Sequence, residues 1–116
     1  MRVLVIDDEP DLRTLYSINL RDAGHEVITA SNGAEGLARV QRDRPDLVLV
    51  DLMMPVMDGY EFLQQLRRMP EHCHTPTVVV SAVATGGYSR KLGASGFVAK
   101  PFDAEELISI VERYAA

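Results

Sequence analysis

The chain has 116 residues, of which 47% are hydrophobic and 25% charged, a balance typical of one globular domain covering residues 1–116. Its apolar runs reach only about five residues, which excludes a membrane-spanning helix and a secretory signal, so we expect no membrane partner. Cys73 is the only cysteine, which excludes an internal disulfide and favours a cytoplasmic location, and the net charge of −5 argues against direct nucleic-acid binding.

Short β-branched runs alternate with amphipathic stretches along the chain. The runs cover residues 3–6, 27–30, 47–50, 77–80 and 97–99. Apolar runs of this length are typical of strands buried in a parallel sheet. The first amphipathic stretch favours a helix that begins near Pro10 and ends before Gly24. Its apolar face is expected to contain Leu12, Leu15, Tyr16 and Leu20.

Capping signals mark the starts of two further helices. Asn32 with Glu35, and Asp103 with Glu106, have the spacing of a capping box. The remaining helix follows Asp58. Between residues 80 and 97 the signal is poorer, and we predict only a short or irregular helix near residues 88–92.

Strands that alternate with helices predict an α/β fold, a doubly wound (βα)5 architecture with a five-stranded parallel sheet. Ligands of such sheets bind beyond the carboxyl ends of the strands. The residues that follow the first, third, fourth and fifth strands are Asp7 and Asp8, Asp51, Ser81, and Lys100.

Three carboxylates at one sheet edge repel one another unless a cation compensates them. All-oxygen ligands favour Mg²⁺, and the charges of three carboxylates, one Mg²⁺ and Lys100 sum to zero. A metal, an ammonium and a hydroxyl would bind the oxygens of a transferred phosphoryl group. The pattern indicates attack by an Asp carboxylate on a phosphoryl donor.

In these strand-end residues, and in two further motifs, the chain resembles the receiver domains of two-component response regulators, which have a flavodoxin-like, CheY-like fold. The motifs are Met-Met-Pro-Val-Met-Asp-Gly at residues 53–59 and Lys-Pro-Phe at residues 100–102. The resemblance covers essentially the whole length. It implies a cis peptide bond between Lys100 and Pro101.

The resemblance also implies roles. Asp51 would accept phosphate from a sensor histidine kinase or a phosphotransfer protein. Asp8, Asp51 and the backbone carbonyl of Met53 would ligate Mg²⁺, and Asp7 would act through a metal-bound water. Ser81 and Lys100 would bind phosphoryl oxygens. Ser81 and Phe97 would form the switch, although Phe97 could also be ordinary strand packing.

The segment from Ser81 to Lys100 spans 19 positions, which is shorter than is usual in the family. The fourth helix would carry this deficit. Many receivers dimerise or meet partners through that region, so a downstream effector protein, or an output domain missing from this sequence, would read an altered surface.

Two other readings remain at this point. One is an interaction module of the same fold that works without phosphorylation. The other is a haloacid-dehalogenase-like phosphatase, which usually needs an Asp where this chain has Met53. We expect no metabolic enzyme. The sequence His72-Cys73-His74 lacks the spacing of a zinc site and is expected to be an exposed loop.

Overall fold

The computed structural model describes residues 1–54, 56–82 and 93–115. Its five strands form one parallel sheet in the order β2-β1-β3-β4-β5. The strands are β1 (Arg2–Ile6), β2 (Glu26–Ala30), β3 (Leu47–Asp51), β4 (Thr77–Ser81) and β5 (Gly96–Ala99). The described helices are α1 (Pro10–Asp22), α2 (Gly33–Asp43), α3 (Gly59–Arg67) and α5 (Ala104–Glu112). The predicted α/β fold is confirmed.

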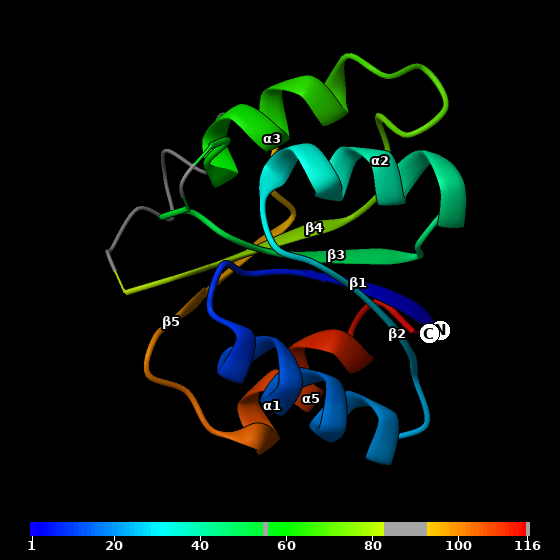
Figure 1. The fold of residues 1–116 in the computed structure, drawn as a ribbon. Helices are drawn as coiled ribbons and strands as arrows, with labels where there is room; N and C mark the ends of the chain where they lie inside the picture. Colours follow the sequence, from blue (N-terminus) through cyan, green and yellow to red (C-terminus); the bar gives the residue numbers. More distant parts are fainter. Residues whose placement is uncertain (55, 83–92, 116) are drawn as a thin grey trace.

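Helices cover both faces of the sheet. Figure 1 shows α2 and α3 on one side and α1 and α5 on the other. The carboxyl ends of all five strands lie at the same edge of the sheet, because all the strands are parallel. The predicted short fourth helix lies outside the described residues. Within the described residues, no helix is both long and apolar enough to cross a membrane.

The sheet divides the core into two apolar clusters. One lies under α2 and α3 and is centred on Phe62, which is fully buried. The other lies under α1 and α5 and includes Leu20 and Leu107. The central strands contribute to both clusters because successive side chains of a strand point to opposite faces. Burial on both faces explains why these strands read as continuous apolar runs.

Side-chain caps begin three of the helices: those at Asn32 and Asp103 are as the sequence predicts, and the one at Asp58 was not predicted. The side-chain oxygens of Asn32, Asp58 and Asp103 accept hydrogen bonds from backbone N–H groups three residues later. The reciprocal half of the expected box at Asn32 is wrong. The Glu35 carboxylate instead accepts bonds from the backbone N–H and the hydroxyl of Ser31.

Two further expectations about burial are wrong. Leu15 is 50% exposed, and Ser17 takes a buried place on α1 instead. Ser17 can be buried because its hydroxyl donates to the carbonyl of Arg13 at 2.7 Å. His72 is also buried, although its loop was expected to be exposed. The segment is nevertheless built of turns, as expected.

Candidate phosphoacceptor site

The carboxyl edge of the sheet gathers the predicted site residues. Asp51 and Ser81 are the last residues of β3 and β4, and Asp7 and Lys100 directly follow β1 and β5. The register pairs Ser81 with Ala99, and the backbone N–H of Lys100 donates to the Ser81 carbonyl at 2.8 Å. Parallel pairing therefore brings together residues that lie far apart in sequence.

The Lys100 ammonium joins two of the carboxylates. Its Nζ lies 3.1 Å from Oδ2 of Asp51 and 3.4 Å from Oδ2 of Asp7. Both carboxylates are nearly inaccessible, with side-chain exposures of 8% and 2%. Removing the ammonium would leave two buried carboxylates without a countercharge. Lys100 therefore compensates charge at this position in the folded protein.

Backbone N–H groups hold the other oxygens of these two carboxylates. Oδ1 of Asp51 accepts from the N–H of Met53 at 3.1 Å. Oδ1 of Asp7 accepts from the N–H of Glu9 at 2.9 Å. Each carboxylate is thus oriented by the residue two positions later in its own loop.

Burial and charge act against each other at this site. Burial raises the pKa of Asp7, while the Glu9 N–H and the Lys100 ammonium lower it only in part. Burial also disfavours the Lys100 ammonium, but the Asp7 and Asp51 carboxylates more than offset this effect and raise the pKa of Lys100. The cation therefore stays protonated at neutral pH.

The acidic residues have the composition of a divalent-cation site. Carboxylate oxygens of Asp7, Asp8 and Asp51 all lie within 4.8 Å of one another. The Asp8 carboxylate forms no hydrogen bond or ion pair with any residue that the structure describes. Lys100 compensates only one of the three negative charges. Two negative charges on oxygen ligands therefore remain uncompensated, and such ligands suit Mg²⁺.

The loop between Asp51 and α3 is packed closely on the acceptor strand. Gly59 donates its N–H to the Leu52 carbonyl, and a Cβ at Gly59 would lie 2.7 Å from the Asp51 carbonyl oxygen. Only glycine allows this approach. The outer part of the loop is exposed: Met53 is 69% accessible and Val56 84%.

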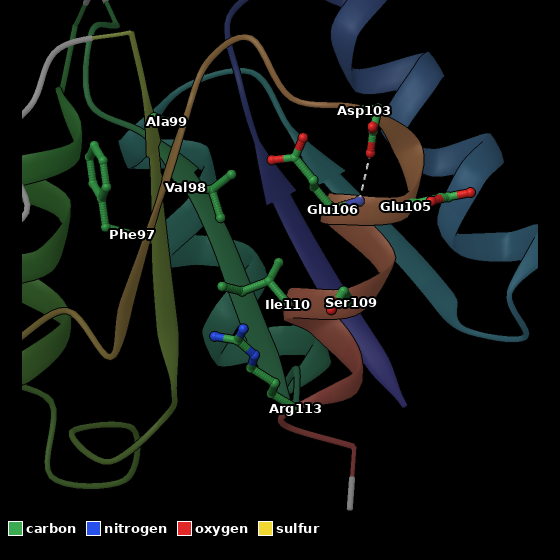
Figure 2. Close-up of a pocket in the computed structure, with 9 residues that line it drawn as sticks. All are labelled: Phe97, Val98, Ala99, Asp103, Glu105, Glu106, Ser109, Ile110 and Arg113. Carbon is green, nitrogen blue, oxygen red and sulfur yellow. Dashed lines mark hydrogen bonds between the residues drawn. The ribbon is translucent and has the colours of Figure 1, made fainter.

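The two proposed switch residues lie on neighbouring strands. Ser81 is 1% exposed at the end of β4. Phe97 is partly buried against the core under α2 and α3, whereas Val98 leaves the opposite side of β5 toward Ile110 of α5 (Figure 2). A shallow cavity of about 490 Å³ lies between β5 and α5 on that second side.

The apolar surroundings of Lys100 were not singled out in the sequence. The ring centroids of Tyr16 and Phe102 lie 5.4 Å apart in a stacked pair. Together with Leu12 and Leu15 they line a cavity of about 390 Å³ beside Lys100. Phe102 belongs to the Lys-Pro-Phe motif noted in the sequence, but its stacking on Tyr16 was not predicted; the Lys100–Pro101 peptide bond is cis, as expected.

Comparison with known proteins agrees with this geometry. The family model described as the response regulator receiver domain matches residues 3–112. The structure of the chemotaxis response regulator CheY4 of Vibrio cholerae superposes with a TM-score of 0.92 at 35% identity, covering 97% of each chain.

Curated relatives give the same assignment. The DNA-binding dual master transcriptional regulator RpaA of Synechocystis is 38% identical, covering 95% of this chain and 47% of its own. The alkaline phosphatase synthesis transcriptional regulatory protein PhoP of Bacillus subtilis is 36% identical, covering 91% of this chain and 45% of its own. This chain spans about half the length of these two relatives. The chain belongs to the receiver domain family of two-component response regulators.

Proposed function

We propose that Asp51 accepts a phosphoryl group from the phosphohistidine of a sensor histidine kinase or of a phosphotransfer protein. One observation carries the proposal. The buried Asp51 carboxylate lies 3.1 Å from the Lys100 ammonium and shares a 4.8 Å cluster with oxygens of Asp7 and Asp8. A nucleophile, a cation and further acidic ligands therefore occupy one edge of the sheet.

The transfer is a displacement at phosphorus. A carboxylate oxygen of Asp51 forms a bond to phosphorus, the bond between phosphorus and the imidazole nitrogen breaks, and its electron pair goes to that nitrogen. The charge on the Asp51 side chain changes from −1 to about −2. The Lys100 ammonium and the Ser81 hydroxyl would bind phosphoryl oxygens and so stabilise this added charge.

Mg²⁺ is the cofactor that these residues suit. Asp8, Asp51 and the backbone carbonyl of Met53 would hold it, and Asp7 would act through a metal-bound water. When bound, the ion would neutralise charge on the transferred oxygens. Asp8 is well suited to this role because the structure gives its carboxylate no partner among the described residues.

The added charge would act on a local switch. Ser81 would move toward the phosphoryl group, and Phe97 would turn inward into the space that Ser81 leaves. The support is their placement: Ser81 ends β4, and Phe97 lies on the adjacent strand with its ring only partly buried.

Another protein or domain would bind the surface that this switch changes. RpaA and PhoP are named as transcriptional regulators and are about twice as long as this chain. We therefore assign the output to a downstream effector protein or to an output domain. The domain would act in the cytoplasm and would turn over no metabolite beyond its own phosphorylation and slow dephosphorylation.

Intact mass spectrometry tests the acceptor. The protein would be incubated with a small acyl-phosphate donor, with and without Mg²⁺, beside Asp51→Asn. Asp22→Asn is the matched control, because Asp22 is an exposed carboxylate at the far end of α1. We expect a gain of one phosphoryl group in wild type and Asp22→Asn that needs Mg²⁺ and is absent in Asp51→Asn.

A gain that persists in Asp51→Asn would refute Asp51 as the acceptor. No gain in folded wild-type protein, from the small donor or from purified histidine kinases, would refute phosphotransfer and favour the interaction module that works without phosphate.

A further inference from the structure

Arg67, the last residue of α3, binds three separate segments through one guanidinium. Its Nη1 donates to the carbonyls of Cys73 and Thr75 at 3.1 and 2.8 Å. Its Nε and Nη2 donate to the Gly93 carbonyl at 3.0 and 2.6 Å. Nη2 also reaches Oγ1 of Thr77 at 3.3 Å. All five N–H donors of the side chain are therefore used.

These acceptors are neutral. Arg67 forms no ion pair with any carboxylate among the described residues. Burial lowers the pKa of Arg67, but an arginine remains charged at neutral pH. Oriented carbonyl groups thus stabilise the cation, and they do so only while the segments that carry them keep their positions.

Gly93 is adapted to this contact in two ways. Its φ of +95° lies in the left-handed region, and a Cβ there would lie 2.8 Å from Nε of Arg67. Two residues later, Ser95 donates its N–H to the Thr77 carbonyl at 2.7 Å, and its Oγ accepts from the Thr77 N–H at 3.2 Å. The entry to β5 is therefore fixed to α3 and to β4.

The register of β5 follows from this entry. Gly96 pairs with Val78, and the pairing continues to Ser81 and Ala99. Among the described residues, β5 pairs only with β4. A slip of one residue would move the end of β5 by about 3.3 Å and reverse its faces. Lys100 directly follows that end.

Resting on the function proposed above, we propose that Arg67 is a positioning residue: its bonds to Gly93 and Thr77 set the register of β5 and thereby hold the Lys100 ammonium on Asp51. α3 links the two ends of this arrangement. Its first residue, Gly59, packs against the Asp51 carbonyl, and its last residue holds the start of the strand that delivers Lys100.

The test is a double-mutant cycle on the rate of Asp51 phosphorylation by a small acyl-phosphate donor. Arg67→Gln removes the positive charge and most of the N–H donors of the guanidinium. The matched control is Arg68→Gln, which removes the same charge from the next, exposed residue. Because a misplacement of 1 Å can cost about a hundredfold in rate, we expect Arg67→Gln to lower the maximal rate at least tenfold at an unchanged half-saturating donor concentration. Arg68→Gln should match wild type.

The same substitution in a Lys100→Met background decides whether Arg67 acts through Lys100. We expect no further loss of rate there, whereas a general structural defect would lower the rate again. Amide hydrogen exchange gives an independent readout: the Lys100 N–H should exchange faster in Arg67→Gln while amides of β1 and β3 keep their protection.

Each other outcome overturns the inference. An Arg67→Gln rate equal to wild type would do so, as would an equal fold loss in both backgrounds. If Arg67→Gln does not fold, Arg67→Lys replaces it, and failure of both to fold would assign Arg67 to the stability of the whole domain instead. A wild-type protein that is not phosphorylated would refute the proposed function, and the exchange experiment would still test the position of β5.

Discussion

Gly59→Ala tests whether the acceptor loop is as closely packed as the structure shows. The new Cβ would lie 2.7 Å from the Asp51 carbonyl oxygen and 2.8 Å from Cα of Leu52, whereas ordinary contact begins at 3.4 Å. Both atoms belong to the backbone, so they cannot rotate away. The loop and α3 must separate by about 0.7 Å or more to accept the methyl group.

The expected cost follows from that displacement. Overpacking in a well-packed region costs about 1–3 kcal/mol, and the better helix propensity of Ala returns less than about 1 kcal/mol. We expect the free energy of unfolding to fall by about 1–2 kcal/mol. Because a catalytic arrangement must be held to within about 0.5 Å, the rate of Asp51 phosphorylation should fall by roughly tenfold.

Gly24→Ala is the matched control. Gly24 has a φ of +95°, but a Cβ there would meet nothing within 4 Å. Alanine in a left-handed conformation costs about 1 kcal/mol, so stability should fall by a similar amount. Gly24 follows the C-terminal end of α1, away from the carboxyl edge of the sheet. The rate of Asp51 phosphorylation in Gly24→Ala should therefore match wild type.

Urea unfolding and a phosphorylation time course measure the two quantities. The reasoning would be refuted if Gly59→Ala unfolded at the wild-type midpoint and was phosphorylated at the wild-type rate. It would also be refuted if Gly24→Ala slowed phosphorylation equally, because the rate would then follow stability and not the geometry of the site.

Three further substitutions test separate features. Val56 has a φ of 70° and is 84% exposed, so Val56→Asn should raise the free energy of unfolding by about 1 kcal/mol; a urea midpoint at or below wild type would contradict the strain argument. Phe62→Ala should lower that free energy by about 3–5 kcal/mol, and a loss under about 1 kcal/mol would show that the cluster does not depend on this ring. Hydrogen bonds from Ser31 lower the pKa of Glu35, so they add stability above the usual carboxyl pKa of 4.5 that is lost as the pH falls through the lowered value. Ser31→Ala should therefore raise the pKa of Glu35 in an NMR titration and destabilise the domain slightly at pH 7 but not near pH 2; an unchanged titration curve would exclude the bond.

The sequence is sufficient to predict which residues gather at the carboxyl edge, because these residues end or directly follow strands. Asp51 and Lys100 are 49 positions apart, yet each follows an apolar run, and parallel strands bring such positions to one edge. The capping residues are equally local signals. Asn32 and Asp103 were identified from a spacing of three residues, and both accept the expected bond.

Features that depend on tertiary packing could not be predicted in this way. Helical periodicity assigns Leu15 to the same apolar face as Tyr16. The position of α1 on the sheet decides that Leu15 stays half exposed while Tyr16 is buried. Arg67 gave no signal at all because most of its acceptors are backbone carbonyls, which the side-chain sequence does not reveal. The Glu35 carboxylate accepts from Ser31 and not from the backbone N–H of Asn32, a choice that the spacing of three residues does not reveal.

The order of the strands places the Lys100 ammonium at the end of an edge strand. Asp7 and Asp51 extend from β1 and β3, which are flanked by other strands on both sides, whereas the ammonium that pairs with them extends from β5 at the margin of the sheet. The carboxylates are thus attached to strands that pair on both sides, and their counterion to a strand that, among the described residues, pairs on one side only. We therefore expect a change in the charge on Asp51 to act through Lys100 on a strand held by one neighbour, so that an electrostatic event at one atom would shift the edge of the sheet.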